Sequence, residues 1–337
     1  MRWQKPASQR AARVRTVVGD MTTTADRVSG PSDAAVHHVM QPVDWLRLAL
    51  PGVIWGSSFY LIAEGLDAFE PALITPLRVL FGFVTLLAFP AARAPIERRD
   101  RGRIALLGVV WLALPLTLFP FAEERVSSSV TGMLNGATPL FVATVATMIA
   151  RRPPPGRQLV GLFVGFAGVV VIALPSLDNG SSSALGVGMI FGALACYGVA
   201  LNVARPLLLR YGSLPVLCRA QAVALVLTAP FGIAVVPESS FEWHSALAVL
   251  ALGVLGTGAA YVLAGANVSR LGSTRASVST YLIPVVALAL GVVLRDERVA
   301  VLAIVGSLVA LLGAYLTNRS PRRAGAEHVA VTVAAGR

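Results

Sequence analysis

Few side chains inside the long apolar stretches of this sequence could do chemistry, and most of those are neutral hydrogen-bonding groups. Thr131, Asn135 and Thr138 follow an i, i+4, i+7 spacing, which puts them on one face of a helix. Aromatic or polar groups interrupt other apolar stretches in the same way: Trp55, Ser58, Tyr60, Tyr197, Asn202, Tyr261, Thr280 and Tyr281. An apolar pocket with a few placed hydrogen-bonding groups is typical of a small-molecule site. We therefore predict that Asn135, Thr138 and these eight residues bind substrate; the alternative for each is a hydrogen bond between helices.

Ionisable side chains within the apolar stretches are fewer still. Glu64, near the end of the first stretch, is the one acidic residue that we place inside any of them, and we expect Glu123 in a loop. Glu64 is either a charged group that couples transport to an ion or a solvated carboxylate at the membrane surface. Arg78 and Arg219 lie about two turns into their stretches. Each either supports the fold, by reaching headgroups or helix carbonyls, or attracts an anionic group of a substrate.

Motifs for catalysis, cofactor binding and metal binding are missing from the sequence. It has no HExxH, GxSxG or GxxxxGK[ST] motif, and its two cysteines, Cys196 and Cys218, fall in apolar stretches away from any histidine cluster. The pair His37-His38 has no other candidate ligand nearby. We therefore expect no catalytic residue, no metal and no cofactor.

The composition indicates which elements must position these residues. Of 337 residues, 55% are hydrophobic and only 13% are charged, and the mean hydropathy is +0.72. A soluble domain carries roughly 25% charged residues, so much of this surface must face lipid. The net charge of +11 is nearly all arginine, with Lys5 the only lysine, and it gathers at the ends of the apolar stretches. That pattern is typical of membrane orientation and argues against nucleic acid as a partner.

Ten stretches are long enough to cross a bilayer as helices, which needs about 20 apolar residues. Because the stretches are continuous, they are not the alternating segments of a β-barrel. We therefore predict an all-α integral membrane protein whose ten transmembrane helices cover residues 46–65, 72–90, 103–121, 129–150, 158–176, 184–204, 213–233, 245–266, 276–294 and 299–317.

The loop arginines predict the orientation. With the N-terminus in the cytoplasm, the outside loops hold only Arg125, Arg295 and Arg298, and every other arginine near a span lies inside. This asymmetry follows the positive-inside rule. Both chain ends are therefore expected in the cytoplasm, in a multi-pass protein of the cell (inner or plasma) membrane.

The second half of the sequence repeats the first. Pro139, Gly161 and Gly168 match Pro284, Gly306 and Gly313, each 145 residues later. Each half holds five spans, and an odd number of crossings inverts the second copy, as in many secondary transporters. We predict a disordered cytoplasmic tail over 1–43, five-helix repeats over 44–177 and 183–318, and a cytoplasmic tail over 319–337. The prolines at 139 and 284 are expected to bend the fourth helix of each repeat and to act as gates.

Several residues resemble the EamA-type branch of the drug/metabolite transporter superfamily, over about residues 45–317. They are Trp55-Gly56-Ser57-Ser58-Phe59, Arg78, Thr138-Pro139-Leu140, Pro284, Gly291 and Asp296-Glu297-Arg298. The family's glycine-glutamate-arginine-like turn is kept as Glu297-Arg298 in the second repeat, whereas the first repeat has Ala150-Arg151-Arg152. The resemblance implies a ten-helix bundle that moves small metabolites or drugs, often outward, without ATP.

We therefore predict a secondary transporter, in the exporting direction, that works by alternating access around a cavity between the two repeats. The alternatives are a non-transporting membrane sensor or assembly subunit and, less favoured, an intramembrane enzyme. The motifs Gly161-x-x-x-Gly165 and Gly188-x-x-x-Gly192 indicate close helix packing, within one chain or in a homodimer. Translation could start at Met1, Met21 or Met40.

Overall fold

The computed structural model describes residues 42–151, 153–177, 180–271 and 277–318. The chain divides into two units, Met1–Gln41 and Pro42–Arg337, and only the second contains described residues. The predictions for the N-terminal tail (all but its last two residues), for the three start codons, for His37-His38, for Arg152 and for the 319–337 tail lie outside the described residues.

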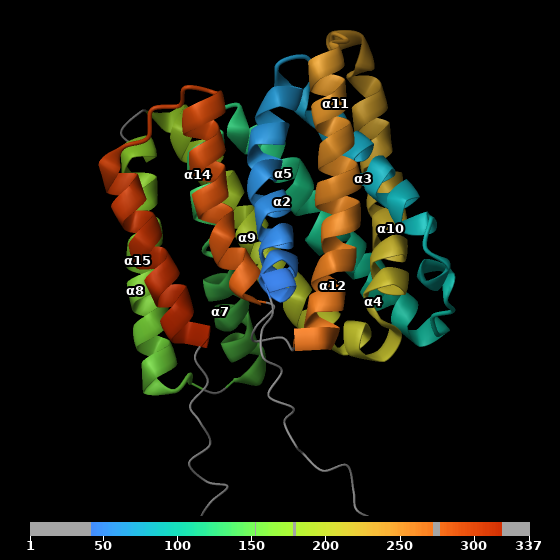
Figure 1. Ribbon diagram of the computed structural model, residues 1–337, viewed down its shortest axis with the longest axis horizontal. Helices are drawn as coiled ribbons and strands as arrows, with labels where there is room; N and C mark the ends of the chain where they lie inside the picture. Colours follow the sequence, from blue (N-terminus) through green and yellow to red (C-terminus); the bar gives the residue numbers. More distant parts are fainter. Residues whose placement is uncertain (1–41, 152, 178–179, 272–276, 319–337) are drawn as a thin grey trace, which may run out of the picture. The chain divides into compact units, whose positions relative to one another are not determined.

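All regular structure in the described residues is helical (Figure 1). The first half contains α2 (Pro42–Leu66), α3 (Pro71–Leu87), α4 (Arg101–Leu107), η4 (Gly108–Ala113), α5 (Leu114–Glu123), α6 (Ser128–Asn135), α7 (Thr138–Ala150) and α8 (Gly156–Leu177). The second half contains α9 (Ser181–Tyr211), α10 (Ser213–Ala234), α11 (Trp243–Ala251), η6 (Leu252–Ala259), α12 (Ala260–Leu271), η7 (Ser277–Tyr281), α14 (Leu282–Leu294) and α15 (Val301–Asn318). Short 3₁₀ turns are η2 (Pro90–Arg93), η3 (Arg98–Asp100) and η5 (Val236–Glu238).

Among the described residues, eight helices are long and apolar enough to cross a membrane, and the apolar helices Pro71–Leu87 and Ser279–Leu294 are shorter. These ten segments fall where the ten spans were predicted. The second span ends at Leu87 instead of residue 90, because Pro90 starts a separate 3₁₀ turn. The sixth span continues to Tyr211 although Pro206 lies inside it. Boundaries, but not the helices themselves, were therefore misplaced.

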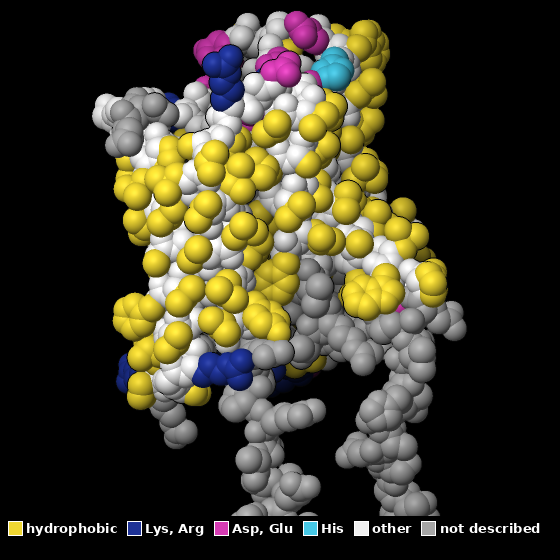
Figure 2. Space-filling model, turned by 60° about the vertical axis from the view of Figure 1, so that its left-hand side comes forward, with side chains coloured by type: hydrophobic (Ala, Val, Ile, Leu, Met, Phe, Trp, Pro, Cys, Tyr) yellow, Lys and Arg dark blue, Asp and Glu magenta, His cyan; other side chains and the backbone are white. Residues whose placement is uncertain are grey.

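Side chains sort by depth as a bilayer requires. Large apolar side chains point outward from the bundle, Phe163, Val226 and Phe231 among them, each about 70% exposed (71%, 73% and 69%). Figure 2 shows hydrophobic side chains over the middle of one face and charged side chains gathered towards its two ends. Pro42 and Asn318 lie at one end of the bundle, which we call the terminal end; the opposite end, with Glu64 and Arg295, is the distal end.

Helices α8 and α15, the last of each half, pack antiparallel through glycines. A methyl group on Gly161 would lie 2.9 Å from the Gly313 carbonyl oxygen, and one on Gly168 would lie 2.7 Å from that of Gly306. Gly161 and Gly306 are repeat equivalents, as are Gly168 and Gly313. Gly161 thus contacts the equivalent of Gly168, and Gly168 contacts the equivalent of Gly161. A two-fold axis between the halves requires this reciprocal pairing.

A second reciprocal contact joins the first helix of each half to the fourth helix of the other. A methyl group on Gly56 would lie 2.6 Å from Cβ of Val286, and one on Gly198 would lie 2.9 Å from the backbone oxygen of Phe141. Gly198 is the equivalent of Gly56, and Phe141 is 145 residues before Val286. The equivalent helices α8 and α15 run in opposite directions, which is the relation that inverted repeats predict.

Backbone irregularities are also duplicated. The third helix of each half contains a π-helical segment, η4 or η6. The fourth helix is interrupted in both halves, before Pro139, where α6 gives way to α7, and before Pro284, where η7 gives way to α14. Arg151 and Asp296, 145 residues apart, are the only described non-glycine residues with positive φ, at 49° and 51°. The two halves therefore share their irregular backbone conformations as well as their helices.

Packing inside the chain accounts for one of the two small-residue motifs. Gly161 and Gly165 face α15 and Leu140 within the same chain. Beside Gly188, by contrast, a methyl group would have no other atom within 4 Å in the described part of the chain. The first motif is thus used for packing within the chain.

Candidate functional site

A cavity of about 580 Å³ lies between the two halves and is lined by residues from both. Eight of the ten residues predicted to bind substrate line it: Trp55, Ser58, Asn135, Thr138, Tyr197, Asn202, Tyr261 and Thr280. Arg78 and Pro139 line it too. The volume is in the range of small-molecule sites, roughly 300–1,000 Å³.

The cavity extends to the terminal end and stops short of the distal end. Its lining includes Gln158, Arg205 and Asn318, which lie on the terminal portions of α8, α9 and α15. Towards the distal end the lining stops at Phe59, Ile62 and Phe119. The rings of Phe59 and Phe119 meet edge to face at 5.5 Å. Apolar side chains thus form the closed end of the cavity.

Arg78 supplies the buried charge of this cavity. Its side chain is part of α3, the residue is 7% exposed, and its Nε donates to Thr257 Oγ1 at 2.8 Å. No carboxylate of the described residues forms an ion pair with it. Thr257 belongs to the π-helical segment η6, and Gln221 on α10 donates to its backbone oxygen at 2.8 Å. A π-helical turn is a common feature of functional sites, and here it aims Thr257 at Arg78.

Aromatic rings form one wall of the cavity. Tyr261 lies between Trp55 and Trp111, with ring centroids at 5.6 and 5.7 Å and edge-on geometry. Trp55 Nε1 donates to the backbone oxygen of Gly256 at 3.1 Å, which fixes the indole. This wall presents ring faces and edges that suit an apolar side chain or an ammonium group.

The neutral polar groups are partly used within the protein. Asn202 Nδ2 donates to the backbone oxygens of Val142 (3.0 Å) and Gly198 (2.8 Å) and so joins α9 to α7. Thr138 Oγ1 donates to the backbone oxygen of Asn135 at 2.7 Å. These side chains thus line the cavity and also make hydrogen bonds within the protein, and their binding of substrate stays a prediction.

Glu64 lies outside the cavity, in a cluster of charges at the distal end. It is 7% exposed, bonds to Arg295 Nη1 at 2.7 Å and contacts His244 Nε2. Arg295 also bonds both oxygens of Asp67, at 2.9 and 3.0 Å. The hydrogen bonds that Arg295 donates to Asp67 and then to Glu64 raise the pKa of Arg295. Glu64 is therefore largely buried and in contact with Arg295 and His244 of the second half. Its proposed role in coupling to an ion stays a prediction.

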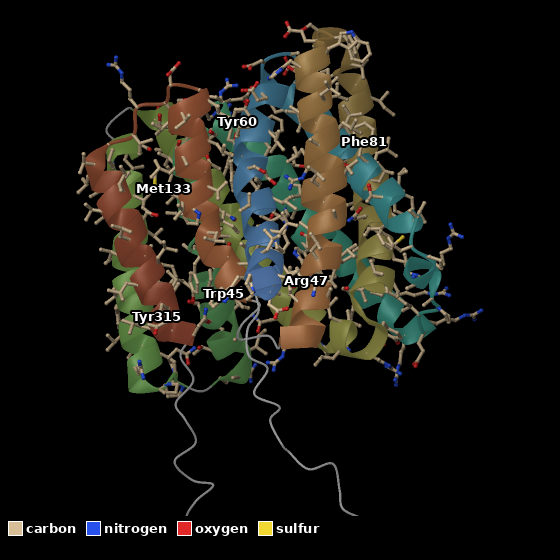
Figure 3. All side chains as sticks on the ribbon, in the orientation of Figure 1. Trp45, Arg47, Tyr60, Phe81, Met133 and Tyr315 are labelled. Atoms are coloured by element: carbon tan, nitrogen blue, oxygen red, sulfur yellow. The ribbon has the colours of Figure 1, made fainter. Side chains whose placement is uncertain are left out.

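Tyr60 does not line the cavity and lies close enough to Glu64 to interact with it electrostatically, so it belongs to this distal cluster. Figure 3 shows Tyr60 near the distal end of α2 and Arg47 near its terminal end. Tyr281 also lies outside the lining, where its hydroxyl accepts from Asn318 Nδ2 at 3.1 Å. Pro284 packs against Gly136 at the interruption of the fourth helix of the first half.

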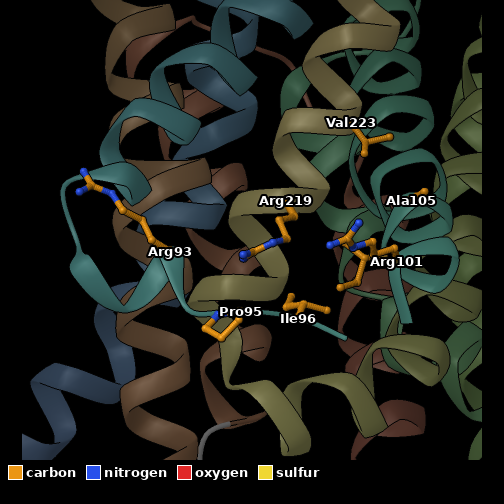
Figure 4. Close-up of a pocket in the computed structure, with 8 residues that line it drawn as sticks. Arg93, Pro95, Ile96, Arg101, Ala105, Arg219 and Val223 are labelled. Carbon is orange, nitrogen blue, oxygen red and sulfur yellow. The ribbon is translucent and has the colours of Figure 1, made fainter. Parts of the chain in front are cut away.

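Arg219, the repeat equivalent of Arg78, forms hydrogen bonds with backbone carbonyl groups. It donates to the carbonyl oxygens of Ala92 (3.2 Å), Ala94 (2.8 Å) and Pro215 (3.1 Å). It lines a separate surface pocket of about 480 Å³ together with Arg93 and Arg101 (Figure 4). The two arginines therefore have different surroundings: Arg78 faces the cavity, whereas Arg219 binds the segment that follows α3.

Sequence reasoning assigned no role to two glutamates that the structure partly encloses. Glu123 was expected in a loop but is the last residue of α5, and neither of its carboxylate oxygens exposes 1 Å² or has a hydrogen-bond partner. Glu297 accepts from the backbone nitrogens of Ser128 and Ser129, both at 2.9 Å, and so caps α6 from the other half. For Glu297 a signal existed in the Asp296-Glu297-Arg298 motif; for Glu123 there was none, since Glu123-Glu124-Arg125 resembles any polar loop.

Both halves of the chain match a known protein family. The model of the EamA-like transporter family matches residues 46–174 and 184–319. Among solved structures, one crystal structure of a protein superposes with a TM-score of 0.59 at 18% identity, covering 82% of this chain and 97% of that one. That likeness concerns the fold alone.

Among curated proteins, an uncharacterized transporter of Archaeoglobus fulgidus is 24% identical, over 82% of this chain and 98% of the relative. A probable terminal-alkyne amino-acid exporter of Streptantibioticus cattleyicolor is 29% identical, over 81% and 92%. A probable amino-acid metabolite efflux pump of Escherichia coli is 24% identical, over 82% and 95%.

Proposed function

The chain belongs to the EamA-like transporter family, within the drug/metabolite transporter superfamily, and on this premise we propose that it exports small metabolites that carry a carboxylate, amino acids among them. The protein is a multi-pass membrane transporter and not an enzyme. The intramembrane-enzyme alternative is therefore wrong, and no catalytic residue needs to be assigned.

The observation that carries the proposal is the buried, unpaired Arg78. Burial of a charge without a counter-charge is costly, and one hydrogen bond to Thr257 uses only one of the five N–H donors of a guanidinium. The remaining donors match a carboxylate, which binds arginine in a two-point geometry. A substrate carboxylate would therefore complete a site that the protein leaves incomplete.

The rest of the cavity suits the other parts of an amino acid. The wall of Trp55, Trp111 and Tyr261 offers ring surfaces to a side chain and to an ammonium group. Asn135 and Asn202 offer amide oxygens. Two relatives bear names of amino-acid or amino-acid-metabolite exporters, at 24% and 29% identity, and these names favour the same class of substrate and the exporting direction.

Alternating access between two inverted repeats is the mechanism we propose. The cavity open at the terminal end and closed at the distal end is one of the two states that this mechanism requires. With ten crossings of the cell membrane and both chain ends in the cytoplasm, as the loop arginines predict, the cavity faces the cytoplasm and is ready to load. The interruptions before Pro139 and Pro284 are the proposed gates, because each breaks a helix that meets the first helix of the other half.

Transport in proteoliposomes tests the proposal. Purified protein would be reconstituted, loaded with unlabelled amino acid and offered tritiated propargylglycine, a terminal-alkyne amino acid, or tritiated leucine or threonine. We expect counterflow of at least one of them, and competition by free amino acids but not by their methyl esters. Equal competition by acids and esters would contradict the carboxylate assignment. Absence of flux for every probe, together with a stable protein partner in a native pull-down, would instead favour the sensor or assembly-subunit alternative.

A further inference from the structure

Glu123 differs from the other buried carboxylates in the described part of the chain. Glu64 is paired with Arg295, Asp100 accepts from Arg210 and Tyr211, and Asp44 lies 3.9 Å from Arg47. The half-buried Glu297 accepts three hydrogen bonds from Ser128 and Ser129. Glu123 is partly exposed as a residue, yet each of its two oxygens exposes less than 1 Å² and neither has a hydrogen-bond partner. Its residual exposure therefore comes from other atoms, and the carboxyl group itself is sealed.

The charged residues near Glu123 do not supply the hydrogen bond or ion pair that its carboxylate lacks. Arg78, Arg295 and Glu297 are close enough to interact with it electrostatically. Arg295 is already bonded to Glu64 and Asp67, Arg78 points into the cavity, and Glu297 has the same sign as Glu123. Of the elements packed on α5, η4 and α6 carry no titratable group, and α3 carries only Arg78. The titratable groups of the other two are Cys196, Tyr197, Arg205, Arg210 and Tyr211 on α9 and Asp44, Arg47, Tyr60 and Glu64 on α2.

A carboxylate that is sealed from water without donors is far less stable than the neutral acid. The protonated side chain needs no counter-charge and leaves at most one donor unsatisfied. In this conformation, Glu123 therefore holds a proton.

The position of Glu123 ties this proton to the opening of the distal end. Glu123 lies one helical turn beyond Phe119, on the same face of α5, and Phe119 belongs to the closed end of the cavity. On the other side lie the distal ion pairs of Arg295. Opening of the distal end must separate these layers, so water would reach Glu123 in the open state and not in the closed state.

From this geometry we propose that Glu123 is the proton-binding group of a substrate/proton exchange. The proton binds an oxygen of Glu123 from water on the distal side, and its binding favours closure of that end. It leaves through the cavity when substrate loads from the terminal side. One O–H bond forms at Glu123 from a distal proton and breaks on the terminal side, so each cycle moves a proton against the direction of substrate. By linkage, the distal-closed state takes up the proton, so acid favours it and alkali favours distal opening. This step rests on the proposed function.

The first experiment measures transport in proteoliposomes of the full chain with tritiated propargylglycine. A pH gradient with its acid side at the distal face should accelerate transport towards that face. Glu123→Gln, which has the shape of the protonated acid, should lose this acceleration, and Glu123→Asp should recover part of it. Glu124→Gln is the matched control, because Glu124 is exposed and bonded to Arg125; it should respond to the gradient like the unaltered protein.

Two outcomes would overturn the proposal: acceleration by the pH gradient that persists in Glu123→Gln, or acceleration of the unaltered protein by a sodium gradient and not by a pH gradient. Monodisperse elution of each variant in detergent excludes misfolding as the cause of a loss.

Infrared spectroscopy decides about Glu123 even if no probe is transported. The unaltered protein and Glu124→Gln should show the carbonyl stretch of a buried, protonated carboxyl group, and Glu123→Gln should lack it. If the infrared result is as expected and no probe is transported, the proposed amino-acid export is contradicted, whereas the assignment of the proton to Glu123 stands. If Glu123→Gln leaves the carbonyl band unchanged, Glu123 is not protonated in this state and the proton site is elsewhere.

Discussion

Two arginines at equivalent positions of the repeat have different roles at the scale of single residues. Arg78 lies in the cavity with one side-chain partner, whereas Arg219 is bonded to three backbone oxygens near the surface. Removal of the charge should therefore affect substrate binding at Arg78 and stability at Arg219, so the two variants can be compared directly.

Arg78→Gln should weaken the binding of a free amino acid by about 10- to 100-fold, because a charge-assisted hydrogen bond to a carboxylate contributes about 1.5–3 kcal/mol. Competition against tritiated propargylglycine, with amino acids and their methyl esters, measures this. Arg78→Gln should also lose the preference for the acid. Arg219→Gln should lower the melting temperature but keep the preference. A preference that survives in Arg78→Gln would assign carboxylate binding to another residue.

Sequence reasoning located eight residues of the cavity lining because a polar side chain in an apolar helix avoids lipid and faces either another helix or a cavity. It failed for Tyr60, Glu64 and Glu123 at the distal end, for one physical reason. Burial there depends on which loops and helix ends meet, and Arg295 and His244 approach Glu64 from parts of the chain about 180 or more residues away. A local sequence pattern does not predict contacts between residues so far apart in the chain.

At the scale of helices, close approach of glycines holds the two halves together. Sequence periodicity predicted the helices and the repeat, and the paired glycines indicated contact. The odd number of spans in each half predicted that α15 runs against α8, and the glycine contacts of the two helices have this direction. The π-helical segments η4 and η6 were not predicted, because an extra residue in a helical turn leaves no mark in hydropathy.

Gly313→Ala tests the α8–α15 contact. A methyl group there would lie 2.2 Å from Cα of Gly165, so the helices must separate, at a cost of about 1–3 kcal/mol. A lower melting temperature in detergent is expected. Gly188→Ala, where nothing among the described residues lies within 4 Å, is the control and should change stability by less than about 0.5 kcal/mol. If both variants melt alike, the glycine contact does not limit stability.

The positive φ of Asp296 gives a second test at this scale. Glycine tolerates φ of 51° without the steric strain of a Cβ atom, so Asp296→Gly should keep or raise the melting temperature. Asp296→Val should lower stability by about 1–2 kcal/mol, because a β-branched residue is disfavoured there. The same pair of changes at Arg151 should have the same signs if the two turns are equivalent. Opposite signs at the two positions would mean that the turns differ in solution.

At the scale of the whole molecule, the ends of the bundle differ in how they are closed. The distal end is held by ion pairs of Arg295 with Glu64 and Asp67 and by Glu297 on the start of α6. All of these join the second half to the first. The cavity, in contrast, reaches the terminal end.

Arg295→Gln should shift the population towards the distal-open state. The test uses Ile62→Cys in a background with Cys196 and Cys218 replaced by alanine, and a membrane-impermeant maleimide added at the distal side. Labelling should be slow with Arg295 present and several-fold faster in Arg295→Gln. Arg125→Gln is the control, since that arginine is also at the distal end but bonds its neighbour Glu124. Unchanged labelling in Arg295→Gln would mean that the apolar layer alone closes this end.

The reciprocal contacts of Gly161 with Gly313 and of Gly168 with Gly306 have an evolutionary consequence. A surface that meets its own counterpart can form between two identical chains before it forms within one. An ancestral half-length gene could therefore have assembled as an antiparallel pair, and fusion of two copies would have kept the seam while releasing each copy to diverge. Position 297 is such a divergence: it is glutamate, whereas the equivalent position 152 is arginine. Only a fused gene can maintain this difference, because two identical chains must carry the same residue at both positions.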